Sequence, residues 1–327
     1  MAYAFPRATR VLKTSDADIA QAAAALRAGG LVAMPTETVY GLAGLATRDE
    51  AVAAIYAAKG RPSFNPLIAH VADLDAATRE ADFDARATAL AEAFWPGPLT
   101  IVAPAPRTRV SLLARAGLDS LALRCPAHPV ARALILAAGA PLVAPSANRS
   151  GRVSPTTAEH VREDLDGRID VILDAGPTRH GLESTIVACL GGEARLLRPG
   201  ALERERIEEV LGERLAGREE GGEVVAPGML ASHYAPRARL RLEAVDADEG
   251  EAALDFAGQL AGSDAKLRLD LSPSGDLTEA AANLFAYLRR LDASGAAAIA
   301  AAPVPWRGLG AAINDRLARA AAPRQGS

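Results

Sequence analysis

Lysine is scarce in this chain of 327 residues: of 36 basic residues only Lys13, Lys59 and Lys266 are lysines, so arginine is the default cation. Cysteine is scarcer still. Cys125 and Cys189 show no CxxC or Cys/His spacing, which argues against a disulfide framework and a zinc site. No apolar run approaches the ~20 residues of a membrane span, and the first residues lack the apolar core of a signal peptide. We therefore expect a cytoplasmic protein with no membrane association.

Several common catalytic motifs are also absent from the sequence. There is no GxxxxGK[ST] loop, no GxGxxG after a strand and no GxSxG elbow, which argues against a P-loop kinase, a dinucleotide enzyme and an α/β-hydrolase. The five histidines have no metal-ligand spacing. A net charge of −4 provides no global field for binding nucleic acid. A local basic site is compatible with this net charge.

Composition and periodicity predict two α/β domains. The hydrophobic fraction of 50% and charged fraction of 23% are ordinary for a globular protein, and the length fits two domains. Over residues 1–212, helices and closely spaced strands predict a twisted, mixed and open sheet. A charged, glycine-rich stretch predicts a linker over 213–237. Over 238–327 a βαβαβα order, with a helix at 250–260, predicts a small, mostly parallel, Rossmann-like domain in three layers.

The most informative segment is KGRPSFN, which begins at Lys59 and follows the strand-like PTETVYGL. In an extended segment, alternate side chains point the same way, so Lys59, Arg61, Ser63 and Asn65 would line one wall. An ammonium, a planar guanidinium and neutral donors suit a nucleotide phosphate or a carboxylate. The alternative is a solvated basic turn after a helix.

Four further segments place polar groups where predicted strands begin or end. LALRCPAHP carries Arg124, APSANRSGRVSPT begins at Ala144, GLESTI carries Ser184, and RPG carries Arg198. Strand ends are where α/β proteins bind ligands, and small polar loops expose backbone N–H groups to anions. Exposed strand-closing arginines and ordinary polar turns are the alternative interpretation.

The predicted linker contains apolar and aromatic residues that a solvated tether would not need. APGMLASHYAP places Met229, His233 and Tyr234 between prolines. Such a loop is typical of a lid or binding loop, in which Tyr234 contacts a nucleotide. Simple packing between domains is the alternative.

Taken together, these segments resemble a known family. PTETVYGL, KGRPSFNPLIAHV, WPGPLT, LALRCPAHP, APSAN, SPT, GLESTI and RPG are similar, in this order, to the motifs of the YrdC-like threonylcarbamoyl-AMP synthases, over about residues 16–200. APGMLASHYAP and GLGAAINDRLARAA resemble the linker and extra domain of the long, two-domain form. Each motif alone is weak, but eight in order are highly specific.

The resemblance implies a basic concave cavity and a nucleotidyltransferase that converts ATP, L-threonine and bicarbonate into threonylcarbamoyl-AMP and pyrophosphate. A tRNA threonylcarbamoyl transferase complex would then modify the adenosine beside the anticodon. We expect Mg²⁺ to accompany ATP, with no dedicated protein metal site and no stable nucleic-acid binding.

The resemblance also implies roles for individual residues. Lys59 and Arg61 would act in the chemistry of the carboxylate and phosphate groups, and no general base is evident. The expected threonine-binding residues are Thr36, Thr38, His70, Arg124, Ala144 and Ser184. The expected ATP-binding residues are Arg61, Asn65, Ser120, Ser146, Ser154, Arg198 and Tyr234.

Two other classes of function remain as alternatives. An RNA-binding module would use the same basic cavity, but the negative net charge and the lack of aromatic residues among the basic ones argue against it. A carbamoyl-transferring domain that uses carbamoyl phosphate would carry zinc-finger and acylphosphatase-like segments, which this chain lacks. The second domain would be purely structural if it only holds the linker.

Overall fold

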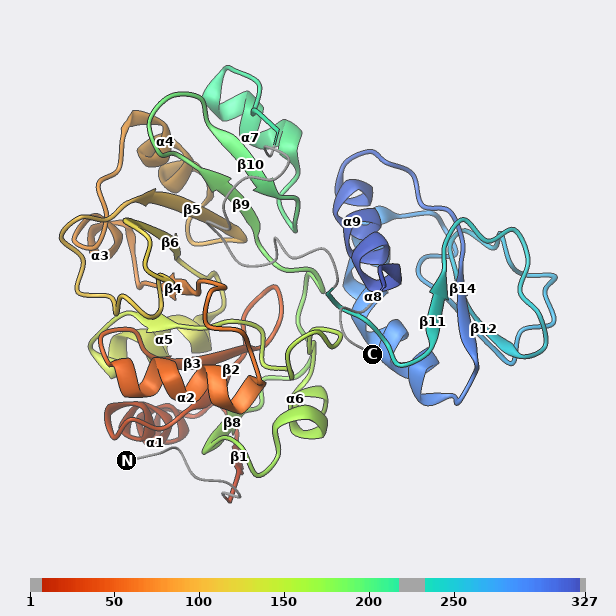
Figure 1. Cartoon of the computed structure of the whole chain (residues 1–327), viewed down its shortest axis with the longest axis horizontal. Coiled ribbons are helices and arrows are strands. Elements are labelled where there is room, and N and C mark those ends of the chain that lie inside the picture. The colour runs from red at the N-terminus through yellow and green to blue at the C-terminus, as the bar shows by residue number, and fades with distance from the viewer. Residues whose placement is uncertain (1–7, 218–232, 324–327) are drawn as a thin grey trace. The chain divides into compact units, whose positions relative to one another are not determined.

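The chain divides into two compact units (Figure 1). The computed structural model describes residues 8–217 and 233–323, so most of the linker predicted for 213–237 lies outside the described residues. In the described ranges the first unit comprises 8–150, 155–178 and 183–217, and the second comprises 151–154, 179–182 and 233–323. Each unit has a sheet of its own.

A mixed sheet forms the centre of the first unit, as predicted. Its strands follow the order β1-β8-β2-β3-β7-β4-β6-β5-β9-β10. The β4/β6 and β5/β9 pairs are parallel, whereas β4/β7, β5/β6 and β9/β10 are antiparallel. The strands are β1 (Arg10–Leu12), β2 (Val32–Met34), β3 (Gly41–Leu45), β4 (Ile68–His70), β5 (Leu99–Pro104), β6 (Ser120–Arg124), β7 (Leu142–Val143), β8 (Val171–Leu173), β9 (Thr185–Ala188) and β10 (Arg195–Arg198).

Local sequence signals set the ends of the helices in this unit. Ser15 and Asp18 form a capping box at the start of α1. α2 ends at Gly60, which adopts the left-handed conformation with φ 62°. The helices are α1 (Asp16–Arg27), α2 (Asp49–Lys59), α3 (Leu74–Thr78), α4 (Ala85–Phe94), α5 (Pro129–Ala138), α6 (Ala158–Leu165) and α7 (Arg204–Leu211).

Helices cover the two faces of the sheet unequally. On one face, apolar strand residues pack with α2 and α6 in one cluster and with α4 and α7 in another. On the opposite face, α1 and α5 pack over the half that contains β8, β2, β3 and β7. Over β4, β6, β5, β9 and β10, the apolar cluster of that face consists of strand residues alone, within the described part of the chain. This half-face is where the sheet presents polar side chains.

Side-chain alternation along β6 shows how one strand serves both faces. Leu121 and Leu123 belong to the helix-covered cluster, whereas Ala122 belongs to the strand-only cluster. Because successive side chains of a strand point to opposite faces, Ser120 and Arg124 share the face of Ala122. The sequence LALR therefore buries two leucines against helices and directs its arginine to the polar half-face.

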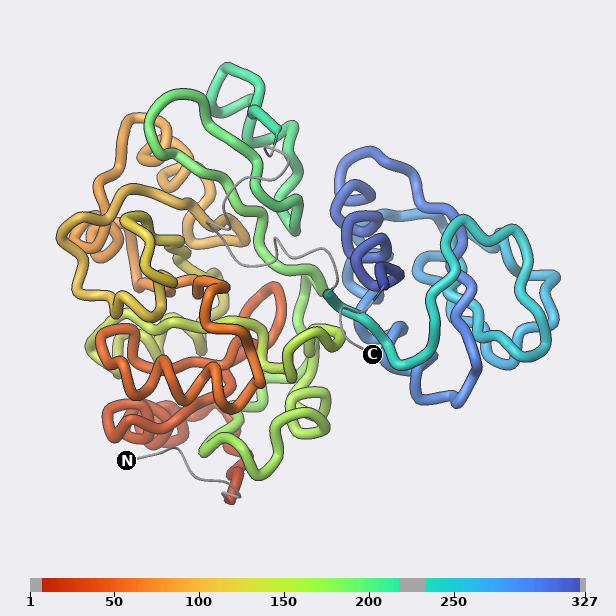
Figure 2. The backbone as a smooth tube through the Cα atoms, viewed as in Figure 1, coloured from red at the N-terminus to blue at the C-terminus, as the bar shows by residue number. Residues whose placement is uncertain are grey.

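The second unit contains a four-stranded sheet in which all pairs are parallel, in the order β11-β14-β12-β13. This unit is mostly the cyan-to-blue part of the backbone trace (Figure 2). The elements are β11 (Arg239–Arg241), β12 (Glu251–Asp255), β13 (Leu267–Asp270), α8 (Leu277–Ala293), β14 (Ala298–Ala301) and α9 (Leu309–Ala321).

The helix predicted for 250–260 is wrong, because this segment contains the strand β12. β12 lies between β14 and β13, and Ala252–Asp255 are all buried. A strand buried on both faces carries a continuous apolar run without period-2 alternation, and its alanine and leucine residues favour helix locally. Tertiary pairing overrides that preference. The Rossmann-like description of this unit remains a prediction.

The turn at Gly200 yields a stability prediction. A Cβ atom on Gly200 would lie 2.4 Å from the backbone C of Ser184 and N of Thr185. Gly200→Ala must therefore move one of two packed backbones, and we expect a loss of about 1–3 kcal/mol in the free energy of unfolding. Gly217→Ala is the matched control, because nothing lies within 4 Å of its Cβ position. Urea denaturation of both variants checks this, and equal stabilities would contradict the packing described.

Candidate functional site

The candidate site lies where β4, β6, β5 and β9 meet. His70 is directly opposite Arg124 in the parallel β4/β6 pair, at the last residue of each strand. The WPGP turn before β5 is hydrogen-bonded to the residue after β6 and to the first residue of β9. The Gly97 N–H donates to the carbonyl of Cys125, and the Pro98 carbonyl accepts from the N–H of Thr185. This turn therefore places the start of β9 beside the end of β6.

Arg124 is buried and partly paired. Its Nη2 donates to Oε1 of Glu37 at 2.7 Å, and its Nε donates to the Gly97 carbonyl at 3.3 Å. Only 4% of the residue is exposed. Its Nη1 has no hydrogen-bond partner among the residues that the structure describes. A guanidinium with one free edge is suited to bind a carboxylate.

PTETVYGL supplies the partner of Arg124 from a turn, so its interpretation as a strand is wrong before Gly41. The Thr36 hydroxyl donates to the carbonyl of Val39 at 2.6 Å and accepts from the N–H of Val39 at 3.3 Å. It also lies 2.8 Å from the hydroxyl of Thr38. Such local side-chain-to-backbone bonds compete with strand pairing. They fix the buried turn in which Glu37 points to Arg124.

His70 is neutral in this environment. Burial and the nearby charge of Arg124 lower its pKa to about 3, although Glu37 acts in the opposite direction. Its Nδ1 lies 3.2 Å from the carbonyl of Ile68. The imidazole therefore adds hydrogen-bonding capacity beside Arg124 without adding a second positive charge at neutral pH.

Ser184 lies at the centre of a second polar cluster. Its hydroxyl is 2.7 Å from that of Thr100 on β5. Arg198, at the end of β10, donates through Nη2 to the Ser184 carbonyl at 2.8 Å and to its hydroxyl at 3.2 Å. β9 and β10 thus bring together the serine of GLESTI and the arginine of RPG.

The KGRPSFN segment is a turn after α2 and not an extended wall, because Gly60 takes the left-handed conformation and reverses the chain. Ser63 is exposed, so it does not join the buried residues of this segment. The solvated-turn alternative is also wrong. Lys59 and Arg61 are only 2% and 9% exposed.

Lys59 holds the APSAN loop. Its Nζ donates to the carbonyls of Ser146 and Asn148, at 2.5 Å each, and its own carbonyl accepts from the N–H of Ser150. Burial and the charge of Arg61 lower the pKa of Lys59 well below its usual value, while Asp164 on α6 opposes the shift. An ammonium in such surroundings gains from an arriving anion.

Arg61 and Asn65 lie together in the part of the KGRPSFN turn that follows Gly60. Arg61 donates through Nη2 to the Pro66 carbonyl at 3.1 Å and through Nε to the Asn65 carbonyl at 3.3 Å. The side-chain Oδ1 of Asn65 is buried without a hydrogen-bond partner among the described residues. Buried amide oxygens are normally satisfied, so this atom is free to meet a ligand.

The APSAN loop is also tied to the strands. The Ala144 N–H donates to the carbonyl of Ile68 at 3.0 Å, and Ser146 forms an isolated bridge with Gly41. The Ala147 N–H donates to the carbonyl of Tyr40 at 2.8 Å. Lys59, the PTET turn and this loop therefore form one connected structure.

Three predicted site residues belong to the opposite end of β6 or to the second unit. Ser120 begins β6, so it is separated from Arg124 by the length of that strand. Ser154 is fully buried and groups with the second unit. Tyr234 is 1% exposed, with φ 63°, and stacks on Phe285 at a centroid distance of 5.5 Å within the second unit. The structure leaves the assigned roles of these residues as predictions.

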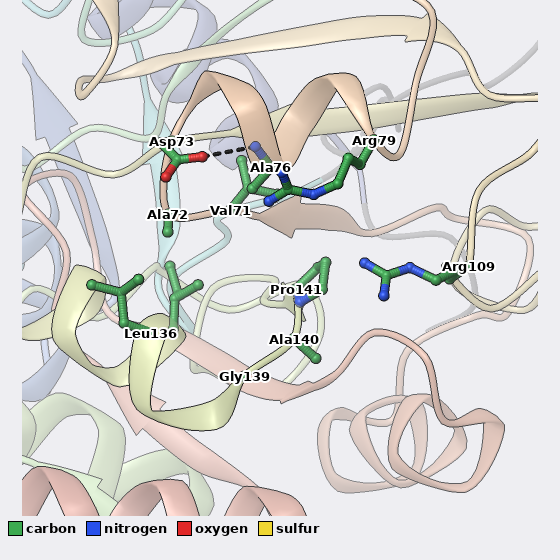
Figure 3. A pocket seen from close by; sticks show the side chains of 11 residues that line it. Val71, Ala72, Asp73, Ala76, Arg79, Arg109, Leu136, Gly139, Ala140 and Pro141 are labelled. Atoms are coloured by element: carbon green, nitrogen blue, oxygen red, sulfur yellow. Dashed lines mark hydrogen bonds between the residues drawn. The ribbon is translucent and has the colours of Figure 1, made fainter.

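A separate surface cavity of about 230 Å³ lies between the β4–α3 segment and the end of α5 (Figure 3). Figure 3 shows Arg79 above Pro141 and Arg109 to its right. None of the predicted site residues lines this cavity, although it begins one residue after His70. We place the candidate site at Arg124 and not in this cavity, because the region around Arg124 contains buried charged side chains.

The described part of the chain contains neither a candidate metal-binding cluster nor a membrane-spanning helix. No group of three or more histidine, cysteine or acidic side chains there is arranged to hold a metal ion. None of the helices described is both long and apolar enough to span a bilayer.

Three residues without a role predicted from sequence are connected to the site by the structure. Glu37 stands inside PTET, Gly97 inside WPGP, and Thr100 within β5. An acidic residue within a threonine-rich motif, in a chain whose other motifs supply arginines, was the available signal for Glu37. Gly97 and Thr100 become visible only through strand pairing.

The low pKa of His70 predicts a stability change in acid. An unfolded histidine has a pKa near 6.5, whereas the folded value is about 3. The contribution of His70 to the free energy of unfolding is therefore fully present above pH 6.5. It is lost as the pH drops toward 3, because the unfolded state binds a proton that the folded state does not. Between pH 6.5 and 5 we expect the titration of His70 to lower the free energy of unfolding by about 2 kcal/mol.

The His70→Gln variant should lack this pH-dependent contribution to the free energy of unfolding. Urea denaturation at several pH values gives the slope of unfolding free energy against pH for wild type and variant. Other titrating groups cancel in the difference between the two slopes. Identical slopes would contradict a buried, neutral His70.

The comparisons with known proteins cover both units. A family profile described as Telomere recombination, of Sua5, YciO and YrdC proteins, matches residues 24–200. A profile described as Threonylcarbamoyl-AMP synthase, C-terminal domain, matches residues 202–322.

Relatives match along nearly the full length. The chain is 41% identical to a threonylcarbamoyl-AMP synthase of Bacillus subtilis, covering 98% of this chain and 97% of the relative. It is 42% identical to that of Pyrococcus abyssi, covering 91% and 92%. The crystal structure of P. abyssi Sua5 complexed with L-threonine is similar with a TM-score of 0.88 and 38% identity, covering 96% of this chain and 98% of that one. The chain belongs to the threonylcarbamoyl-AMP synthase family.

Proposed function

We propose that this protein is an L-threonylcarbamoyladenylate synthase, which makes threonylcarbamoyl-AMP and pyrophosphate from L-threonine, bicarbonate and ATP. The observation that carries the proposal is Arg124. Its buried guanidinium lies beside a neutral His70 and the hydroxyl-rich PTET turn, and its Nη1 has no hydrogen-bond partner among the described residues. This is a site for the carboxylate of a small polar amino acid. The names of the relatives and the threonine complex of P. abyssi Sua5 agree with it.

The reaction has two bond-forming steps. The threonine amine attacks the carbon of bicarbonate, a C–N bond forms, and water leaves with the amine proton. An oxygen of the resulting carbamate then attacks the α-phosphorus of ATP, and the bond to the bridging oxygen breaks to release pyrophosphate. Both steps bring anions together, so the protein must neutralise charge and position the reactants.

The threonine-binding role rests on the polar half-face. Arg124 would bind the carboxylate, while His70 and the hydroxyls would orient the rest of the amino acid. Arg124 is fixed by Gly97 and Glu37, so the site is organised before the ligand arrives. The residues assigned to threonine are Thr36, Thr38, His70, Arg124, Ala144 and Ser184.

The ATP-binding role rests on the Lys59 turn and the Arg198 cluster. Lys59 holds the carbonyls of Ser146 and Asn148, and we assign it to positioning this loop as well as to neutralising phosphate. Mg²⁺ on the triphosphate would share that charge. The residues assigned to ATP are Arg61, Asn65, Ser120, Ser146, Ser154, Arg198 and Tyr234.

The product is a reactive mixed anhydride, so it requires a consumer. We propose that it passes to a tRNA threonylcarbamoyl transferase complex, which modifies the adenosine beside the anticodon. The same proposal assigns the linker over 213–237 to folding over the active site of the catalytic domain, 1–212, with the small domain over 238–327 holding it. Activity in the cytoplasm fits this use.

Pyrophosphate release from ATP by the purified protein tests the proposed function. We expect release to require both threonine and bicarbonate, because the carbamate is the nucleophile. Omission of either should reduce release to background. Release that ignores threonine would contradict the proposal, and the site would then be tested for nucleic-acid binding.

Two arginine substitutions should separate the two substrates. Lysine keeps the charge but loses the planar pair of donors. Arg124→Lys should raise the KM for threonine about tenfold or more with little change for ATP, and Arg61→Lys should do the reverse. Exposed Arg132 on α5 supplies the control, Arg132→Lys. If both variants affected both substrates equally, the division of the site would be wrong.

A further inference from the structure

Glu37 is a buried carboxylate with one oxygen unused. Its Oε1 accepts from Nη2 of Arg124 at 2.7 Å, whereas its Oε2 is buried and has no hydrogen-bond partner among the described residues. The residue is 6% exposed. Buried carboxylate oxygens are normally satisfied, and an unsatisfied one is costly. An oxygen left in this state beside a ligand site suggests that a ligand completes it.

The surroundings of Glu37 keep it ionised. Burial raises its pKa, but the charge of Arg124 and its hydrogen bond outweigh burial, so the pKa lies below its ordinary value. The backbone N–H groups of Glu37 and Ala127 act in the same direction, although neither forms a hydrogen bond with Oε2. The other titratable groups nearby are neutral at neutral pH. Burial lowers the pKa of His70 and of His128, and it raises that of Cys125 to about 11.

The site therefore contains one negative and one positive group, and each has an atom that is available for a further hydrogen bond. Arg124 has a free Nη1, and Glu37 has a free Oε2, with respect to the residues that the structure describes. A free amino acid is a zwitterion that presents the complementary pair, a carboxylate and an ammonium group. The hydroxyls of Thr36 and Thr38 already contact each other, and Thr36 also donates to Val39. Glu37 is therefore the charged acceptor available at this position.

We infer that Oε2 of Glu37 binds the amino group of the amino-acid substrate while Arg124 binds its carboxylate. This inference rests on the proposed function and adds a residue to it. Glu37 is assigned to holding and aiming the nitrogen. Its low pKa makes it a poor store for a proton, so the ammonium loses its first proton to solvent before attack. The second proton leaves in water with the bicarbonate hydroxyl, as the C–N bond forms and a C–O bond of bicarbonate breaks.

Calorimetric binding of two ligands tests this assignment: L-threonine and 2,3-dihydroxybutyrate, in which a hydroxyl replaces the amino group. Wild type should bind threonine about tenfold or more tightly than the analogue, since a hydrogen bond to a charged group is lost. Glu37→Gln should weaken threonine binding by a similar factor and leave the analogue little changed or tighter, because a charge near its carboxylate is removed.

Glu80→Gln is the matched control. Glu80 is also a buried glutamate paired with an arginine, Arg109, but it faces Thr108 away from the site. It should retain the wild-type preference for threonine. Thermal unfolding of each variant verifies folding.

The outcomes are distinct. Equal loss of both ligands in Glu37→Gln would mean that Glu37 only supports Arg124, and it would overturn the assignment while the proposed function stands. Unchanged selectivity would overturn it likewise. If wild type bound no threonine and released no pyrophosphate, both would fall. If Glu37→Gln does not fold, wild type alone decides, because an analogue that binds as tightly as threonine excludes an amine-binding carboxylate.

Discussion

The buried pair of Arg124 and Glu37 imposes the strictest requirement on the first unit. Two charges removed from water are tolerated only when hydrogen bonds compensate each, and loss of one partner costs about 3–5 kcal/mol. The pair is assembled from segments distant in sequence, because Glu37 comes from the turn after β2 and the Gly97 carbonyl from the turn before β5. The sheet must therefore bring these turns to the end of β6. The site is organised before any ligand binds.

The layer arrangement provides the space for such a pair. Where α1 and α5 cover the sheet, the strands carry apolar side chains on both faces. Where no described helix covers it, apolar residues alternate with Arg124, His70, Thr100 and Ser184. The same sheet thus supplies a rigid core in one half and a polar ligand surface in the other. Loops anchored by Lys59 border that surface.

Much of this organisation could be predicted from sequence, because local signals marked it. Arg124 and Arg198 end strands β6 and β10, and Ser184 directly precedes β9, as predicted for the LALRCPAHP, RPG and GLESTI segments. What failed depended on distant partners. The 250–260 segment becomes strand β12 through pairing with two neighbours, and Gly60 turns KGRPSFN away from an extended path. α7 and β1 were not predicted, since both are short and gain stability from packing onto other elements. The role of Glu37 required knowing which side chain faces Arg124.

The central claim is that the amino-acid site lies at the end of β6, and not in the cavity between α3 and α5. A crystal structure of this chain with L-threonine tests it most directly. The account predicts the threonine carboxylate within hydrogen-bond distance of Arg124, beside His70. Threonine bound elsewhere, for example in the cavity between α3 and α5, with the free edge of Arg124 still unused, would contradict it.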